Sequence, residues 1–219
     1  TPSNYFRDSV LMGGPNGTRG VYYANDMTTN RSLSYQANDE VLSAYLMADF
    51  QLFEKLRVSG GVRVEEGSMY ITNKVDTIIG DNPSLVGKGE SKDLDFLPAV
   101  NFTYSIMETM NLRLSYSHSL GRPSFRERAP YEFYEYTEGL TILGNPNLDR
   151  VLADNFDLRW EYFFSPGEMV STSFFLKKIY NPIERYQQQT TTNVSTYRNG
   201  YDSDLYGLEI EFRKDLDFF

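Results

Sequence analysis

The chain has one histidine, and the residues beside it limit the chemistry that it can perform. His118 lies between Ser117 and Ser119, so the residue types of a serine hydrolase are adjacent in the sequence. Nucleophilic catalysis needs the serine and the imidazole within hydrogen-bond reach. Successive side chains of a strand point to opposite faces, so neither serine can pair with His118 in a regular strand. A hydrolytic site would need a serine from elsewhere in the chain, and we expect no enzyme activity.

The sequence predicts no metal or cofactor site. Zinc cannot be held by one histidine without cysteine. Oxygen-bearing side chains gather at residues 145–149 and 202–204, but their spacing differs from that of a calcium-binding EF-hand loop. The glycine-rich stretch 13–17 lacks the Lys-Ser/Thr pair and the helix that follow a phosphate-binding loop.

Recognition by aromatic rings is the chemistry that the sequence favours. Residues 131–136 interleave aromatic and acidic side chains within a long connection between two predicted strands. Such rings can stack on a siderophore, a porphyrin or a sugar, and nearby arginines can bind anionic groups. The same residues can instead pack loop against loop, with the arginines paired to neighbouring glutamates. The predicted ligand-binding residues are Tyr131, Phe133, Tyr134, Tyr136, Arg122 and Arg126.

Long amphipathic strands are the elements that would position these residues. Between Val41 and Phe53 the even-numbered residues are apolar, whereas the odd-numbered ones include Ser43, Asp49 and Gln51. Alternation at period two is typical of a strand whose faces meet different surroundings. The predicted strands cover residues 39–53, 56–65 with a continuation to 71, 94–106, 110–120, 151–164, 169–185 and 197–214.

The lengths of the strands and of their connections indicate the fold class. Globular strands average about five or six residues, and about nine to eleven tilted residues cross a bilayer. The predicted strands are longer, and their connections alternate between about two and about thirty residues. Outer-membrane barrels have this combination, with tight turns at one end and long loops at the other. We therefore predict an all-β fold, an antiparallel meander of about seven long strands forming part of a transmembrane β-barrel. A soluble sandwich is the alternative.

The predicted faces of the strands have different roles. The even-numbered apolar face is expected to meet outer-membrane lipid, and the odd-numbered face to line a lumen. Trp160, Tyr162, Phe164 and Tyr104 are expected at the interface on the short-turn side, unless they pack in a sandwich core. His118 would be an interface residue near the outer end of its strand.

Composition supports these predictions by exclusion. The 219 residues contain no run of about 18–20 apolar residues, so no membrane-spanning helix is expected. A net charge of −9 argues against a nucleic-acid partner. The absence of cysteine excludes disulfides and suits the bacterial envelope. The N-terminal residues lack the features of a signal peptide, and we expect the chain to be an excerpt of a longer protein.

Several short motifs, in order, resemble those of one family. Residues 122–127 read Arg-Pro-Ser-Phe-Arg-Glu, residues 144–148 read Gly-Asn-Pro-Asn-Leu, and residues 206–211 read Tyr-Gly-Leu-Glu-Ile-Glu. Together with residues 40–45 and 60–65, they resemble the barrel of TonB-dependent outer-membrane receptors, over roughly residues 38–215. The resemblance implies an internal portion of a barrel of about twenty-two strands, without the plug domain and the remaining strands. Residues 1–37 would be a long extracellular loop region and residues 38–219 the partial barrel.

The resemblance also implies a function and partners. The intact protein would lie in the outer membrane of a Gram-negative bacterium and import a scarce nutrient: a siderophore, a metal complex, a vitamin or a glycan. Its energy would come from TonB, acting through the plug domain that this chain lacks. The alternatives are a soluble β-rich carbohydrate-binding module and an outer-membrane enzyme.

In this family, acidic residues on the inner wall pair with arginines of the plug. The matching residues here are Asp157, Glu161, Glu209 and Glu211. They can instead be solvated lumenal charges, or be neutralised within the wall by inward arginines. Those arginines are Arg57, Arg63, Arg113 and Arg159.

Overall fold

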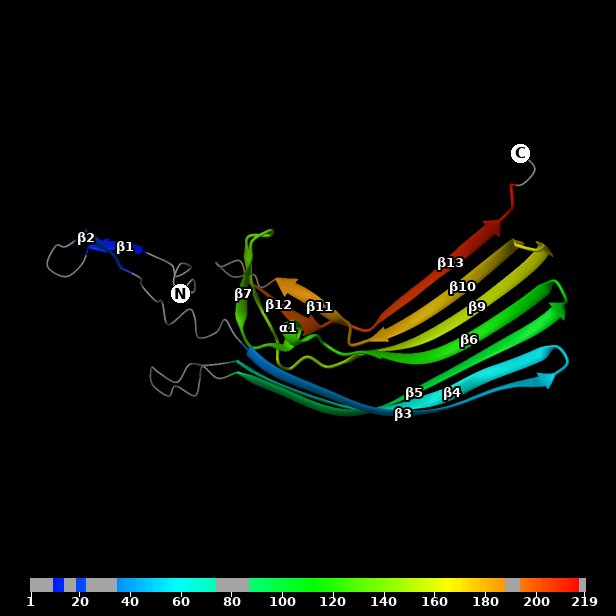
Figure 1. Ribbon diagram of the computed structural model, residues 1–219, viewed down its shortest axis with the longest axis horizontal. Helices are drawn as coiled ribbons and strands as arrows, with labels where there is room; N and C mark the ends of the chain where they lie inside the picture. The colour runs from blue at the N-terminus through cyan, green and yellow to red at the C-terminus, as the bar shows by residue number, and fades with distance from the viewer. Residues whose placement is uncertain (1–9, 14–18, 23–34, 74–86, 188–193, 217–219) are drawn as a thin grey trace, which may run out of the picture.

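The computed structural model describes residues 10–13, 19–22, 35–73, 87–187 and 194–216, almost entirely as strands (Figure 1). A seven-stranded antiparallel sheet dominates, with the order β13-β10-β9-β6-β5-β4-β3. Its strands are β3 (Tyr35–Phe53), β4 (Leu56–Asn73), β5 (Lys88–Met107), β6 (Met110–Gly121), β9 (Val151–Ser165), β10 (Glu168–Tyr180) and β13 (Ser203–Arg213). The predicted fold class is confirmed. The two edge strands, β3 and β13, do not pair with each other, so the sheet is open within the described chain.

The register of the sheet keeps all even-numbered residues on one face. One row of directly opposite residues crosses all seven strands and is apolar throughout. It consists of Phe50, Val58, Phe102, Leu114, Leu158, Phe174 and Leu208. Because side chains alternate along each strand, a slip of one residue would move such a row to the opposite face. The apolar pattern therefore fixes the pairing as well as the existence of the strands.

Three two-residue turns join neighbouring strands at one end of the sheet, as the sequence predicts. They are residues 54–55, 108–109 and 166–167, and they lie together at the right of Figure 1. Gly167 has a φ of 82°, which suits a residue without Cβ. Each turn is accompanied by a register shift, at Gln51/Phe53, Ser105/Met107 and Glu168/Met169. Tight turns at one end leave all of the long connections at the other.

The last two predicted strands are wrong in extent. The strand predicted over 169–185 ends at Tyr180, and residues 183–187 form β11 (Ile183–Gln187) in another sheet. The strand predicted over 197–214 is likewise two strands, β12 (Val194–Asn199) and β13. The chain changes sheet at Asn181-Pro182, where Asn181 has a φ of 52°, and at Gly200, whose N–H donates to the Pro182 carbonyl over 2.7 Å. Proline lacks an N–H and so ends the ladder there.

The long connection between β6 and β9 has structure that the sequence analysis did not predict. It contains α1 (Phe125–Arg128), β7 (Glu132–Glu135) and β8 (Leu140–Leu143). These strands join β11 and β12 in a four-stranded sheet of order β11-β12-β8-β7, in which β12 and β8 run parallel. Parallel pairing joins segments that are far apart in sequence, and no local pattern reveals it.

Two boundaries at the long-loop end also differ from the prediction. β5 begins at Lys88, six residues before the predicted start at 94, because residues 88–93 pair with β4. β3 begins at Tyr35, and β1 (Val10–Gly13) and β2 (Arg19–Tyr22) form a short hairpin in the region expected to be loop. The rest of the loops expected at 1–37 and 73–93 lies outside the described residues.

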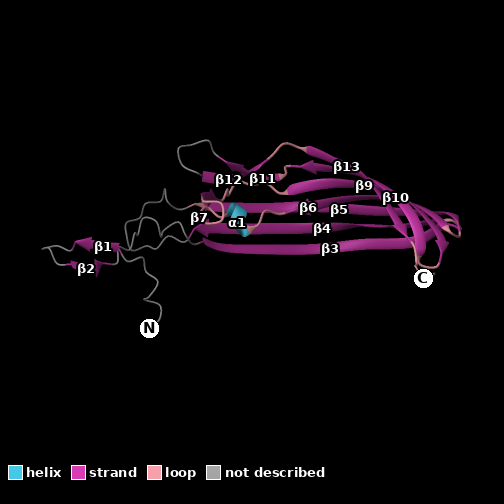
Figure 2. Ribbon diagram, turned by 90° about the horizontal axis from the view of Figure 1, so that it is seen from above, coloured by secondary structure: helices cyan, strands magenta, loops and turns pink. Residues whose placement is uncertain are grey.

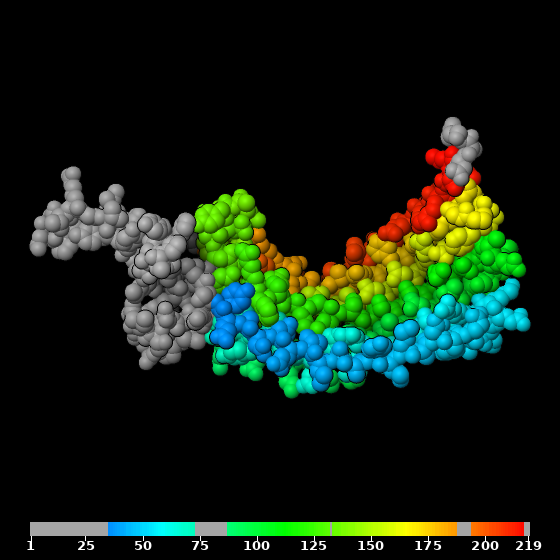
Figure 3. Space-filling model, in the orientation of Figure 1, coloured from blue at the N-terminus to red at the C-terminus, as the bar shows by residue number. Residues whose placement is uncertain are grey.

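The seven-stranded sheet is curved, and its two faces have different surroundings. In Figures 1 and 2 the connection with α1 and β7 lies over the concave side, at the end opposite the tight turns. The odd-numbered Met69 and Ile71 of β4 are buried, as are Ala129, Ile142 and Leu148 of the connection, and Arg128 of the connection contacts the Met69 sulfur over 3.9 Å. The odd-numbered face is therefore concave and the even-numbered face convex. The space-filling view shows the hollow of the concave side (Figure 3).

The convex face carries large apolar side chains with nothing packed on them. Leu42, Leu46 and Ile210 are 76%, 77% and 72% exposed. Trp160, Tyr162, Phe164 and Phe212 form a chain of neighbouring rings on this face beside the tight turns. Among the described residues, no helix has the length and apolarity needed to cross a membrane.

Candidate functional site

Arg128 fixes the connection between β6 and β9 onto the sheet. The short helix α1 begins with a capping box, in which the Ser124 N–H donates to the Glu127 carboxylate over 2.7 Å. The helix ends at Arg128, which is only 4% exposed. Its guanidinium donates to the Ser91 hydroxyl over 2.6 Å and to the carbonyl oxygens of Pro146 and Glu90 over 3.0 and 3.3 Å. Burial lowers the pKa of Arg128 from its usual value, and its five N–H groups need all of these acceptors.

The Gly-Asn-Pro-Asn-Leu motif completes this anchor. A Cβ at Gly144 would lie 2.0 Å from the Ala129 carbonyl oxygen, so only glycine fits. The Asn145 N–H donates to the Glu127 carbonyl over 2.7 Å, and its side chain donates to the Tyr197 carbonyl over 2.9 Å. Leu148 is 2% exposed. The motif therefore joins α1, β12 and the start of β9.

Arg122 belongs to a network of ion pairs beneath the connection. It contacts Glu65 over 2.9 Å and Asp95 over 3.6 Å, and its guanidinium lies against Gly67. Arg150 also contacts Asp95, over 2.7 Å, and pairs with Asp93. Two buried carboxylates thus hold arginines from both ends of the connection. The Arg122 guanidinium is already paired with carboxylates of the sheet, so we do not include Arg122 in a ligand-binding surface.

The predicted aromatic patch divides into a packed half and an exposed half. Tyr131 packs on Tyr35 and Phe133, with ring centroids 5.0 and 5.7 Å apart. The Arg126 guanidinium lies 3.6 Å from the centre of the Phe133 ring. Burial raises the pKa of Tyr131. Tyr134 and Tyr136 form a separate edge-to-face pair and are 52% and 87% exposed.

In the four-stranded sheet that carries this patch, an ion pair joins the edge strand β11 to the turn between β7 and β8. Arg185 of β11 donates to Glu138, in the turn between β7 and β8, through two bonds, one of 3.1 Å. The Arg185 contact lowers the pKa of Glu138 below its usual value. The exposed tyrosine pair, before that turn, is consequently carried by a braced hairpin.

On the concave wall, two of the four predicted lumenal carboxylates are paired with arginines of the same wall. Glu161 accepts from Arg113 over 2.8 Å and from Arg159 over 2.9 Å. Glu211 accepts from Arg159 over 2.9 Å and from Arg213 over 2.8 Å. The other inward arginines pair elsewhere, Arg57 with Asp49 and Arg63 with Glu65.

The other two carboxylates have no cationic partner in the described chain. Asp157 accepts only the Ser115 hydroxyl, over 3.3 Å. Asp157 also lines a hollow of about 380 Å³ on the wall, together with Ser115, Arg57 and Asn101. Glu209 is exposed, and its side chain makes no hydrogen bond or ion pair with a described residue. These two groups are therefore open to a partner that enters the concave side.

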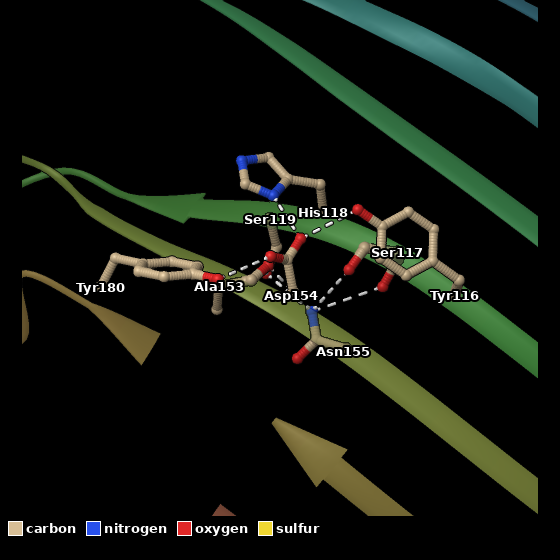
Figure 4. Close-up of polar contacts among 8 residues, drawn as sticks. All are labelled: Tyr116, Ser117, His118, Ser119, Ala153, Asp154, Asn155 and Tyr180. Carbon is tan, nitrogen blue, oxygen red and sulfur yellow. Dashed lines mark hydrogen bonds and ion pairs between the residues drawn. The ribbon is translucent and has the colours of Figure 1, made fainter. Parts of the chain in front are cut away.

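The side chain of His118 lies on the opposite face of the sheet from those of the two neighbouring serines (Figure 4). Its imidazole and the Asp154 carboxylate are 2.8 Å apart on the convex face. Ser117 and Ser119 lie on the concave face, where the Asn155 amide donates to both hydroxyls over 3.4 and 3.0 Å. The expected separation of histidine from these serines is confirmed. Within the described ranges, no group of three histidine or acidic residues is arranged to hold a metal ion.

Comparison with known families gives this geometry a context. The barrel family described as TonB dependent receptor-like, beta-barrel matches residues 2–219. The chain belongs to the TonB-dependent receptors. The resemblance predicted from the motifs is confirmed, and members of this family are outer-membrane transport receptors. A comparison with curated protein sequences found no match.

Two solved structures show the same fold as this TonB-dependent receptor chain. The hemophore receptor HasR of Serratia marcescens, in complex with its hemophore and heme, is 14% identical with a TM-score of 0.61. That similarity covers 80% of this chain and 31% of HasR. The siderophore receptor PirA of Pseudomonas aeruginosa is 16% identical with a TM-score of 0.50, covering 80% of this chain and 39% of PirA. The chain thus spans less than half the length of either receptor.

Sequence reasoning missed three residues that organise this receptor segment. Arg128 and Arg150 anchor the long connection, and Asp154 carries the cluster around His118. Arg128 directly follows the Arg-Pro-Ser-Phe-Arg-Glu motif, and this position was its only signal. The role of Asp154 depends on cross-strand register, which the sequence does not display.

Proposed function

We propose that this chain forms part of the barrel of an importer in the outer membrane of a Gram-negative bacterium. The observation that carries the proposal is the sorting of side chains by parity on one curved sheet. The convex face is largely apolar, and the concave face carries ion pairs and two carboxylates without an ion pair to a described residue. A wall between hydrocarbon and a water-filled, plugged lumen has these properties.

The same observation argues against a soluble carbohydrate-binding module. Soluble proteins rarely leave a contiguous apolar patch of more than a few hundred square ångströms in contact with water. Here exposed leucine, isoleucine and phenylalanine side chains run along the convex face from β3 to β13. Lipid is the partner whose chemistry fits such a face.

Two consecutive residues of β6 provide the test, because Leu114 is convex and Ser115 concave. In the intact receptor embedded in lipid, a spin label is attached to Leu114→Cys or to Ser115→Cys, the chain itself having no cysteine. We expect the label at 114 to collide mainly with oxygen, which concentrates in lipid, and the label at 115 to be shielded from it. Equal accessibility of both sites to a water-soluble nickel complex would exclude a lipid-facing wall.

The intact receptor would gate a lumen that the concave face lines. We infer that Asp157 and Glu209 contact a plug domain, because these carboxylates form no ion pair with a residue of the described wall. Arginine donors of a plug would form charge-assisted hydrogen bonds with them. TonB would then deliver energy to the plug rather than to the barrel wall.

The ligand surface would be the exposed tyrosine pair of the β7–β8 hairpin. Tyr134 and Tyr136 are exposed and belong to the hairpin whose strand β7 lies over the concave side (Figure 1). Rings of this kind stack on planar aromatic ligands. We favour a ferric siderophore or haem, since PirA is a siderophore receptor and HasR binds a hemophore and heme.

Replacement of both tyrosines tests this surface. A panel of ferric siderophores and haem is titrated against the intact receptor, and the ligand that binds is used for the variants. Two stacking contacts at about 0.5–1.5 kcal/mol each predict about a tenfold loss of affinity for Tyr134→Ala with Tyr136→Ala. Tyr134→Phe with Tyr136→Phe keeps both rings and should restore most of the affinity. Unchanged affinity in the alanine variant would place the ligand elsewhere.

A further inference from the structure

The convex face carries a compact polar cluster that is built from three strands. Asp154 of β9 accepts from the Tyr116 hydroxyl of β6 over 2.9 Å and from the Tyr180 hydroxyl of β10 over 3.2 Å. His118 of β6 contacts the same carboxylate over 2.8 Å. Because a carboxylate only accepts, the proton of this contact is on Nδ1 of the imidazole. Figure 4 shows the second ring nitrogen pointing away from Asp154.

The cluster lies at one level of the outward surface. His118, Asp154, Lys178 and Asp204 are directly opposite one another in four neighbouring strands. This row is four residues from the apolar row that contains Leu114 and Leu158, a distance of about 13 Å along the strand. Leu120 and Leu152 lie beyond it, towards the long loops. Ionisable side chains on an outward face at this level belong where a membrane changes from acyl chains to headgroups.

Two groups of the cluster remain available to an anion: the Lys178 ammonium group, and the second imidazole nitrogen of His118, which donates when the ring carries two protons. Asp154 is occupied by three donors on β6 and β10, and Lys178, although opposite Asp154, makes no ion pair with any residue that the structure describes. Lys178 and Asp204 are both exposed, and Asp204 makes no ion pair with a described residue. His118 and Lys178 flank Asp154 on its two neighbouring strands, and the backbones of these two strands are about 10 Å apart. The lysine side chain is long and flexible, so its ammonium group and the imidazole of His118 can contact the same anion.

We propose that His118 and Lys178 bind the phosphate of an outer-leaflet lipid headgroup, with Asp154 as a positioning residue that holds the imidazole. The inference rests on the proposed function, since it requires the convex face to meet lipid. A lipid fits better than a free anion because apolar rows lie on both sides of the cluster and offer contacts to acyl chains. Imidazolium and ammonium groups are suited to phosphate by charge and by hydrogen bonding.

Binding of defined lipids to the intact receptor tests the proposal. Delipidated receptor in detergent is titrated with lipid A bearing its phosphates and with the same lipid after their removal, and bound lipid is counted by native mass spectrometry. We expect the phosphorylated lipid to bind at least tenfold more tightly. His118→Gln with Lys178→Gln should reduce this preference to less than threefold. Lys177→Gln, on the concave face of the same strand, should leave it unchanged.

Each alternative outcome counts against the proposal. Equal affinity for both lipids, or an unchanged preference in the double variant, would make the cluster a cross-strand clamp only. Displacement of the lipid by millimolar inorganic phosphate would make it a free-anion site. Lys178→Gln alone removes no contact of the described chain, so this variant controls for a folding defect caused by the change at His118. It should lower the preference for the phosphorylated lipid severalfold. If the label at position 114 is lipid-exposed but no preference is found, this inference fails and the importer assignment stands.

Discussion

Asp157 and Glu209 differ from the other inward carboxylates in what the wall supplies to them. Glu161 and Glu211 each have two arginines, whereas Asp157 has one hydroxyl and Glu209 no described partner. A hydrogen bond to a charged group contributes about 1.5–3 kcal/mol. We therefore expect Asp157→Ala with Glu209→Ala to loosen the plug of the intact receptor and to raise the permeability of the outer membrane to large antibiotics severalfold.

The control for that experiment removes the same charge elsewhere. Glu54→Ala with Glu108→Ala changes two exposed carboxylates in the tight turns and touches no lumenal group. Antibiotic susceptibility should be unchanged in this control. Equal susceptibility of the lumenal variant and the wild-type receptor would leave both carboxylates as solvated wall charges.

Glu138 gives the ligand-bearing hairpin a predicted dependence on pH. Its pKa is lowered in the folded receptor, mainly by the hydrogen bonds from Arg185. The contact is fully present above the usual glutamate pKa of about 4.3 and is lost as the pH falls through the lowered folded value. A spin label at Thr137→Cys should consequently gain mobility between pH 6 and pH 3.

Glu138→Gln is the matched variant for this measurement. It cannot titrate in that range, so the mobility of the label should be high at both pH values and should change little between them. The same pH response in Glu138→Gln and in the parent protein would assign the response to another group.

At the scale of elements, the long connection after β6 depends on one glycine. Gly144 lies so close to Ala129 that an added Cβ would overlap its carbonyl oxygen. We expect Gly144→Ala to displace α1 and to release Arg128 from its carbonyl partners, at a cost of about 3 kcal/mol or more. Limited proteolysis of the intact receptor should cut residues 121–150 much faster in this variant.

Gly121→Ala, at the last residue of β6, controls for the loss of a glycine next to this connection. The nearest atom to its added Cβ is the Val151 Cβ at 3.8 Å, an ordinary contact. Proteolysis of this variant should match the wild type. If both variants resist cleavage equally, the close contact at Gly144 is relieved by a small backbone shift and does not anchor the connection.

At the scale of the whole molecule, the sheet is a wall whose two edges are unpaired among the described residues. β3 and β13 end the sheet order, and the convex face between them is apolar. Exposed strand edges and large apolar patches both favour association in water. Since HasR and PirA are more than twice as long as the segments that align, we expect further strands to pair with both edges in the intact receptor.

The apolar face and the charged face follow different rules at this scale. The apolar rows need only the correct parity, because lipid accepts any apolar side chain. The charged face needs specific partners, because its ion pairs join particular residues of one or more strands, such as Arg113 of β6 with Glu161 of β9. The convex face should therefore tolerate exchanges among apolar side chains, whereas the concave face depends on particular charged residues.

The sequence alone determined the long strands, the tight turns at one end and the parity of the two faces. These are local properties, since alternation at period two and short turn motifs are complete within about ten residues. The motifs around Arg122, Gly144 and Tyr206 also predicted the family. The boundary errors at Asn181 and Gly200 arose where apolar alternation continued across a change of sheet.

Only the tertiary structure decided which charged and aromatic residues remain available. It placed Arg122 in an ion-pair network, divided the aromatic run into packed and exposed halves, and left Asp157 and Glu209 without an ion pair to any described residue. It also brought Asp154 to His118 across 36 residues of sequence. The physical reason is that the free energy of a polar side chain depends on its cross-strand partners, and register between distant segments is a property of the assembled sheet.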